Sequence, residues 1–283
     1  MIQLYNKTGA ETSKIITQIY STSFSLGIKA FNKQYREPIY NIYGFVRIAD
    51  EIVDTFHGYD KKYLLNKFKK DTFEAIELGI STNPILHSFQ KTVREYKIET
   101  ELINAFLKSM EMDLSISSHE KQSYDEYING SAEVVGLMCL RVFVQNNPRL
   151  YNELKPYAKT LGSAFQKVNF LRDIKDDIYE RGRIYLPDVH HVNDITDFNK
   201  MEFEKEIEKE FNGAFIGIMK LPMGVRLGVY LAYVYYRTLF NKLKGKSIEE
   251  IKLKRIRVSN FSKFSLFVKS FFHIKIFNAG LNN

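Results

Sequence analysis

Apolar residues recur at intervals of three and four along most of this 283-residue chain. The pattern is clearest in three segments, namely Ile15, Ile16, Ile19 and Tyr20, then Ile39, Ile42, Tyr43 and Val46, and then Leu102, Ala105, Phe106 and Met110. This spacing places apolar side chains on one face of an α-helix, and no convincing series of alternating strands accompanies it. The sequence therefore predicts an all-α fold. No internal repeat or low-complexity linker divides the chain, so we expect a single domain over residues 1–283.

Composition narrows the class of protein. Hydrophobic residues make up 45% of the chain, which favours a sizeable core over disorder. The single cysteine, Cys139, can form no intrachain disulfide, which is typical of a reducing compartment. The N-terminus has no apolar run typical of a secretory signal, and no stretch approaches the roughly 18 apolar residues of a membrane span. These observations favour a cytoplasmic location.

The positive charge is concentrated near the C-terminus. Residues 241–283 contain ten Lys or Arg and two Glu, which accounts for the whole formal net charge of +8. Within this stretch a set of residues recurs at helical spacing, namely Phe261, Phe264, Val268, Phe271, Phe272 and Lys275. Such a helix either lies on an anionic membrane surface or packs its Phe face on the protein's own core. We favour packing, and expect only weak peripheral association with the inner face of a membrane. Nucleic acid is not an expected partner, because no recognition motif accompanies the charge.

Acidic residues gather in the segment VNFLRDIKDDIYERGRIYLP, residues 168–187. At 100° per helical residue, the side chains of Gln166, Asn169, Asp173 and Asp177 lie within about 80° of one another. These oxygen-bearing side chains form one stripe on a helix that is otherwise partly apolar. The stripe predicts a site for a cationic ligand.

A second acidic cluster lies in FVRIADEIVDTF, residues 45–56. Asp50 and Asp54 are four residues apart, so they share a helix face, and Arg47 precedes Asp50 by one turn. One such pattern alone is best interpreted as a solvated face with salt bridges. Two of them in apolar helices favour a shared site, because burying an acidic pair without partners costs several kcal/mol.

Arginine and a divalent metal are the cations that would balance these carboxylates. Mg²⁺ prefers oxygen ligands and is often held by one or two carboxylates together with substrate phosphates. The Cys and His residues lack the arrangement of a zinc site, and no Gly-rich loop indicates a nucleotide. The hypothesis is that two facing carboxylate helices hold Mg²⁺ and a diphosphate. The apolar helices around them point to an isoprenoid diphosphate with a long hydrocarbon tail.

The chain resembles the squalene and phytoene synthase family, the head-to-head prenyl synthases. The resemblance is carried, in order, by SFSLGI (23–28), YGFVRIADEIVD (43–54), GSAEVVGLM (130–138), QKVNFLRDIKDDIYERGRIYLP (166–187) and RVSNFSK (257–263). The wording of the fourth motif, especially ERGRIYLP, looks most like bacterial phytoene synthases. One motif departs from the family, because Asn129 and Glu133 stand where members commonly have Tyr and Gly.

The resemblance implies a single-domain isoprenoid synthase fold with helices around a central cavity. It implies that Mg²⁺ is bound by Asp50, Asp54, Asp173 and Asp177, with Asn169 and Asp176 close by. It implies that diphosphate is held by Arg47, Arg172 and Arg257. It further implies that the first substrate site is lined by Ser21 and Phe24, and that the reacting carbons are surrounded by Tyr43, Gln166, Tyr185 and Tyr235.

The implied reaction joins two geranylgeranyl diphosphates to phytoene through a cyclopropyl diphosphate, as in carotenoid biosynthesis. Mg²⁺ is the expected cofactor, with Mn²⁺ as a substitute, and NADPH is not expected. Three alternatives stay open. They are a squalene or dehydrosqualene synthase acting on farnesyl diphosphate, a chain-elongating prenyltransferase or cyclase, and a noncatalytic family member that acts as an assembly or binding protein.

Overall fold

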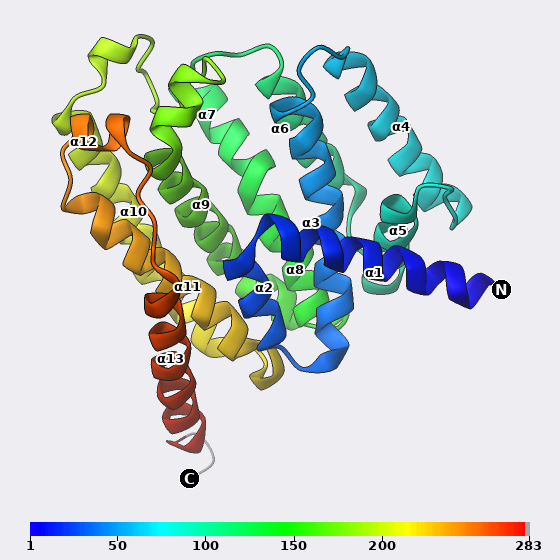
Figure 1. Ribbon diagram of the computed structural model, residues 1–283. Helices are drawn as coiled ribbons and strands as arrows, with labels where there is room; N and C mark the ends of the chain where they lie inside the picture. Colours follow the sequence, from blue (N-terminus) through cyan, green and yellow to red (C-terminus); the bar gives the residue numbers. More distant parts are fainter. Residues whose placement is uncertain (281–283) are drawn as a thin grey trace.

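The computed structural model describes residues 1–280, apart from the side chains at positions 260 and 278–280. Within this range, β pairing is limited to one isolated bridge between Ser118 and Ile184. The helices, shown in Figure 1, are α1 (Ile2–Tyr20), α2 (Thr22–Lys29), α3 (Lys33–Asp54), α4 (Lys61–Leu78), α5 (Pro84–Tyr96), α6 (Thr100–Asp113), α7 (Lys121–Ile128), a π-helix η1 (Asn129–Glu133), α8 (Val134–Phe143), α9 (Pro148–Tyr179), a 3-10 turn η2 (Val192–Asp194), α10 (Asp197–Lys220), α11 (Met223–Lys244), α12 (Ile248–Leu253) and α13 (Asn260–Gly280). The predicted all-α class is confirmed. The single-domain prediction stays a prediction, and its last residues, 281–283, lie outside the described part.

Local sequence signals set several helix boundaries. The Asn83 side chain accepts hydrogen bonds from the N–H groups of Ile85 and Leu86 in α5, and the Asn147 side chain accepts one from the N–H of Leu150 in α9. In both helices a proline stands at the first position. Thr196 begins α10 with a reciprocal capping box. Gly79 ends α4 in the left-handed conformation, with a φ of 72°. These short-range contacts explain why the helices begin and end near the positions that the sequence indicates.

The middle of the molecule is formed by α3, α8 and α9, with α10 and α11 on one side and α4 and α5 on the other (Figure 1). The longest helix, α9, has 32 residues and packs against α8, α10 and η1. Its contact with η1 is unusually close, because a Cβ added at Gly162 would lie 2.6 Å from the carbonyl oxygen of Ala132. This close crossing holds α9 at a fixed distance from the π-helix and the start of α8.

The C-terminal helix α13 extends away from the rest of the protein at the lower left of Figure 1. It packs on α11, yet Phe261 is 83% exposed, Phe264 67% and Phe272 58%. The interpretation that this Phe face packs on the protein's own core is therefore wrong. The reason is that α13 is apolar on two faces, and Leu266 and Ile274 on the other face make the contact with the core. None of the helices described within residues 1–280 has both the length and the apolar composition needed to cross a bilayer.

Candidate active site

The two acidic clusters lie at the C-terminal ends of α3 and α9, and the structure brings these ends together. Arg181, just beyond α9, joins them, because its Nη1 lies 2.8 Å from Asp177 Oδ1 and its Nε lies 3.5 Å from Asp54 Oδ2. Arg183 adds a second link, with Nη1 2.8 Å from Asp54 Oδ1. Carboxylates separated by more than 100 residues in the sequence thus face one polar region.

Two further arginines bind the remaining carboxylates of α9. Arg172 makes a two-pronged contact with its neighbour Asp173, with Nε–Oδ1 2.8 Å and Nη2–Oδ2 2.5 Å. Arg255, from the segment after α12, lies 2.8 Å from Asp173 and 3.5 Å from Asp176. The planar guanidinium group suits carboxylate and phosphate equally well, so these arginines could exchange one for the other. The region therefore has both the acids for a metal and the cations for a diphosphate.

Burial leaves part of this negative charge uncompensated. It raises the pKa of Asp50 to about 7, although Arg47 opposes the shift. Burial likewise raises the pKa of Asp177 to about 7, with the Asp173 charge adding to it. A raised pKa means that the negative charge of the buried carboxylate is poorly compensated, and a bound divalent cation would supply that compensation.

The side chains of the acidic region fit Mg²⁺ if the metal and a diphosphate bind together. In the described part of the chain, no three His, Cys, Asp or Glu side chains form a ready-made metal site. Mg²⁺ does not require one, because it keeps several waters and takes one or two carboxylates plus substrate phosphates. The paired carboxylates of α3 and α9 suit that mode of binding, in which metal and diphosphate enter together.

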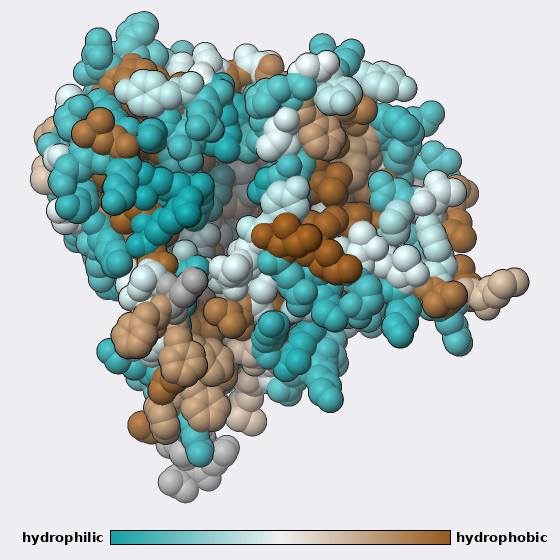
Figure 2. Space-filling model, in the orientation of Figure 1, coloured by the Kyte–Doolittle hydropathy of each residue, from teal (hydrophilic) through white to brown (hydrophobic). Residues whose placement is uncertain are grey.

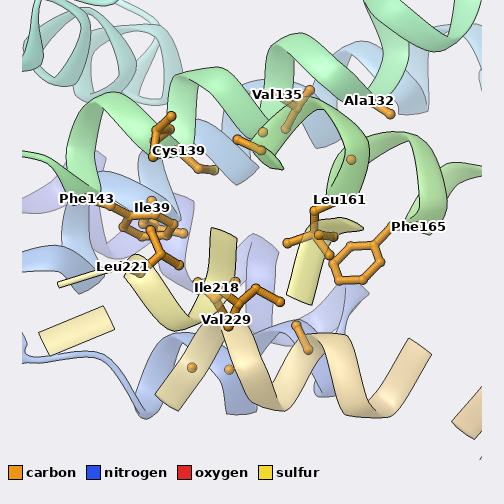
Figure 3. Close-up of a pocket in the computed structure, with 18 of the residues that line it drawn as sticks. Ile39, Ala132, Val135, Cys139, Phe143, Leu161, Phe165, Ile218, Leu221 and Val229 are labelled. Carbon is orange, nitrogen blue, oxygen red and sulfur yellow. The ribbon is translucent and has the colours of Figure 1, made fainter. Parts of the chain in front are cut away.

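An apolar cavity of about 250 Å³ lies beside the acidic region. Figure 3 shows side chains from several helices pointing into it, including Ile39, Val135, Phe143, Leu161, Ile218 and Val229. Its lining is almost entirely apolar, and Ser131 and Gln166 supply polar groups. Leu140 and Phe165 line the cavity, whereas Leu137 and Met138 pack in the surrounding core. Such a cavity suits a hydrocarbon.

Two helices connect the cavity to the acidic region. On α3, Val46 lines the cavity, and Asp50 follows one turn later. On α9, Phe165 and Gln166 line the cavity, and Asn169 follows one turn after them. Asn169 Nδ2 donates to Gln166 Oε1 at 3.3 Å. A ligand in this place would have its apolar part in the cavity and its anionic part at the carboxylates and arginines.

Aromatic rings stand at the border between these two regions. Phe24, which lines the cavity, stacks on Tyr43 with ring centroids 5.0 Å apart. Phe165 stacks on Tyr236 at 4.1 Å, and the Tyr236 hydroxyl donates to Asn169 Oδ1 at 3.2 Å. Burial raises the pKa of Tyr43 to about 12, so its hydroxyl stays protonated. Tyr235 meets Tyr236 edge to face at 5.5 Å.

Tyr185 lies in a separate buried network instead of on the cavity wall. Its hydroxyl donates to Asp113 Oδ1 at 2.7 Å and accepts from Arg183 Nη1 at 3.2 Å. Tyr127 donates to the other oxygen of Asp113 at 2.9 Å. Burial raises the pKa of Asp113 to about 6. Because Arg183 also binds Asp54, this network holds the segment after α9 against the end of α3.

The remaining expected site residues have other partners in this conformation. Ser21 Oγ caps α2 by accepting from the Phe24 N–H at 3.2 Å. Arg47 pairs with Glu51 on its own helix and lies 4.4 Å from the centre of the Tyr20 ring. Arg257 is exposed, and its backbone carbonyl accepts from Lys242. In the described part of the chain, none of these three side chains makes a hydrogen bond or ion pair with the carboxylates expected to bind metal, although the charge of Arg47 acts on Asp50.

Sequence reasoning did not assign several residues of the site, namely Arg181 and Arg183 within the motif at 166–187, and Arg255 and Asp113 outside it. Arg255 stands two positions before Arg257 in a basic run, and only the fold shows which of them reaches α9. Asp113 at the end of α6 has an acidic neighbour only at Glu111, two residues before it and on another helix face, so no spacing pattern marks it. The basic run around Arg255 was a usable signal, whereas no local signal marked Asp113.

Comparison with known proteins decides the family. The model of the squalene/phytoene synthase family matches residues 17–190, more than half of the chain. The chain belongs to the squalene/phytoene synthase family. Among relatives within it, a presqualene diphosphate synthase of Rhodopseudomonas palustris is 29% identical over 169 residues, covering 59% of this chain and 58% of its own. Phytoene synthase 1 of Solanum lycopersicum is 26% identical over 267 residues, covering 86% and 63%.

A solved structure extends the likeness to the fold. The crystal structure of a dehydrosqualene synthase in complex with ligand superposes with a TM-score of 0.82 at 22% identity, covering 96% of this chain and 98% of that one. The predicted squalene/phytoene synthase type of fold is therefore confirmed. The chain spans about three fifths of the length of the two sequence relatives. The three names differ in their product, so membership of the squalene/phytoene synthase family leaves the substrate open.

Proposed function

We propose that this protein catalyses the Mg²⁺-dependent head-to-head condensation of two prenyl diphosphates. One observation carries the proposal. Both α3 and α9 run from an apolar cavity to paired carboxylates that arginines surround. A prenyl diphosphate has a hydrocarbon tail that would fill the cavity and an anionic head that would reach the carboxylates and arginines.

The polar end would bind the metal and the diphosphate. Mg²⁺, or Mn²⁺ in its place, would be held by the carboxylates Asp50, Asp54, Asp173 and Asp177, with Asn169 and Asp176 beside them. When bound, the metal neutralises negative charge on the departing diphosphate. Arg172 and Arg255 would share that role, because they already lie against the carboxylates that the metal would take over.

The apolar end would guide the carbon chemistry. In the first step the allylic C–O bond of one substrate breaks, and diphosphate leaves with the electron pair. The double bond of the second substrate attacks the cation, and loss of a proton closes a cyclopropyl diphosphate. Ionisation of this intermediate releases the second diphosphate, and rearrangement with loss of a second proton gives a linear hydrocarbon with a central conjugated triene, without NADPH. The stacked rings at the cavity border stabilise positive charge on carbon, and the apolar walls exclude the water that would trap it.

For the substrate, we propose geranylgeranyl diphosphate and therefore phytoene. The support is the similarity to a phytoene synthase along 86% of this chain, together with the wording of the motif at 166–187. Chain length depends on the end of the cavity away from Phe165, where Ile39, Phe143 and Leu221 lie together (Figure 3). One methylene there changes the binding free energy by only about 1 kcal/mol, so small changes in the wall would alter the preference.

The test supplies purified protein and Mg²⁺ with farnesyl or geranylgeranyl diphosphate, each with and without NADPH. Extracted hydrocarbons are identified by mass. We expect a C40 product from geranylgeranyl diphosphate without NADPH, and none after a chelator removes the metal. A C30 product from farnesyl diphosphate alone would replace the proposal with dehydrosqualene synthesis, and an NADPH-dependent C30 product would replace it with squalene synthesis.

A melting-temperature measurement on the same samples distinguishes an enzyme from a noncatalytic binding protein. Mg²⁺ with a prenyl diphosphate should raise the melting temperature, because a ligand that binds only the folded state stabilises it. Stabilisation without any hydrocarbon product would support a noncatalytic binding role and would contradict the proposed activity.

A further inference from the structure

The helix α13 has two apolar faces, and one of them is uncovered. At 100° per residue, the inner face holds Leu266, Ser270 and Ile274, and Ser270 and Ile274 are buried against the protein at 2% and 3% exposure. The outer face covers about 140° of the helix. Its side chains are exposed, namely Phe261 (83%), Phe264 (67%), Val268 (37%), Phe271 (43%), Phe272 (58%) and Ile276 (72%). A helix that is apolar all round is normally covered on every side.

Charge limits what can cover this outer face. Residues 260–280 contain no Asp or Glu. Two exposed lysines, Lys269 and Lys275, stand on the outer face or at its border. A second copy of the chain would place these like charges opposite one another without a carboxylate between them, because a two-fold interface pairs a patch with itself. A partner that is anionic at its surface and apolar beneath it would neutralise the lysines and bury the phenylalanines.

The position of α13 favours a lipid as that partner. Lys263, in its first turn, donates to Thr22 Oγ1 of α2 at 3.2 Å. Phe24 and Ile28 of the same short helix form part of the cavity wall. In Figure 2 the apolar surface of α13 lies on the same face as a second apolar patch over α1. A bilayer on the outer face would thus lie beside the wall of the cavity that suits hydrocarbons.

We infer that the outer face of α13 docks on the surface of an anionic lipid bilayer. The phenylalanines enter the boundary between headgroups and acyl chains, and Lys269 and Lys275 meet the anionic headgroups. The helix lies along the interface and does not cross it. The proposed reaction gives this docking a use, since its substrates and product have long hydrocarbon tails. The docking itself depends on neither substrate nor turnover.

Flotation of the full-length protein with vesicles tests the inference. Vesicles of phosphatidylcholine with phosphatidylglycerol should bind the protein at low salt, and vesicles of phosphatidylcholine alone should bind it much less. The triple variant Phe261→Ser, Phe264→Ser, Phe272→Ser should lose at least about tenfold in partitioning, because it removes most of the apolar contact. The variant Lys269→Gln, Lys275→Gln should lose roughly 25-fold, since each lysine near an anionic surface contributes about fivefold.

A matched control removes exposed apolar side chains elsewhere. Tyr63 and Leu78 on α4 are each 63% exposed, and α4 lies on the opposite side of the molecule from α13 (Figure 1). The variant Tyr63→Ser, Leu78→Ser should bind vesicles like the wild type. Circular dichroism and melting temperature verify that each variant is folded. If the Phe variant does not fold, the lysine variant alone tests the inference.

Three results would overturn the inference. One is wild-type protein that stays off anionic vesicles at low salt. Another is a folded Phe or Lys variant that binds as well as the wild type. The third is a wild-type dimer that the Phe variant dissociates while neither binds vesicles, which would assign the outer face to self-association. These measurements contain no substrate. A negative flotation result therefore does not contradict the proposed reaction, and a negative result for hydrocarbon formation does not contradict the docking.

Discussion

At the scale of single residues, the carboxylates of the site differ in how they are balanced. Asp173 is held by Arg172 and Arg255, whereas burial raises the pKa of Asp50 to about 7. The arginines can move to a diphosphate only if another cation takes over their carboxylates. This exchange of partners is the physical reason for expecting metal and diphosphate to bind together.

Replacing either carboxylate by its amide removes the charge that the metal would balance. Asp50→Asn and Asp173→Asn should each lower turnover by at least about a hundredfold, as is common for groups that act on transition-state charge. The measurement is hydrocarbon formation from geranylgeranyl diphosphate and Mg²⁺, with melting temperature to verify folding. Asp71→Asn is the control, because Asp71 pairs with Lys67 on the surface of α4. Near-normal activity in either site variant would contradict the metal assignment.

At the scale of elements, the close crossing of α9 and η1 positions both the cavity and the acidic stripe. Gly162 lines the cavity and lies against the backbone of Ala132, so the crossing leaves no room for a side chain. By contrast, Gly213 on α10 has only a methyl group of Thr160 near its added Cβ, at 3.8 Å. The two glycines therefore serve different purposes although both are helical.

This difference predicts opposite effects of the same substitution. Gly162→Ala should destabilise the protein by roughly 1–3 kcal/mol, because its Cβ meets a backbone carbonyl that cannot turn away. Gly213→Ala should be neutral or stabilise it by up to about 1 kcal/mol, because alanine favours the helix. Urea unfolding of both variants checks the signs. A Gly162→Ala variant as stable as Gly213→Ala would mean that the crossing is less tight than described.

At the scale of the whole molecule, buried carboxylates couple folding to pH. Burial raises the pKa of Asp50 and Asp177 to about 7 and that of Asp113 to about 6, against 3.8 in an exposed chain. The folded state therefore holds these protons more tightly than the unfolded state. Their contribution to stability is complete below about pH 4 and is lost as the pH rises to about 7.

In metal-free protein this contribution can be isolated with an amide variant, since Asn resembles the protonated carboxyl. Asp50→Asn should be more stable than the wild type at about pH 8, by about 1–3 kcal/mol after allowance for partial exposure. At about pH 4 the two should be nearly equal, because Asp50 is then protonated. Urea unfolding at both pH values, in the presence of a chelator, measures the difference. A wild type that is the more stable of the two at about pH 8 would show that Asp50 is well compensated without metal.

The sequence by itself determined the helical class, the two acidic stripes and the family. These follow from periodicity within one helix, as for Asp50 and Asp54, or from contiguous motifs such as residues 166–187. The tertiary structure alone decided which distant groups meet. It placed Arg255 instead of Arg257 on Asp173, joined Arg183 to Asp54, and brought the unmarked Asp113 beneath Tyr185. It also decided that α13 packs through Leu266 and Ile274 and leaves its phenylalanines exposed. A helix with two apolar faces carries no local signal for which face is covered, since that choice depends on the shape of the surface against which it packs.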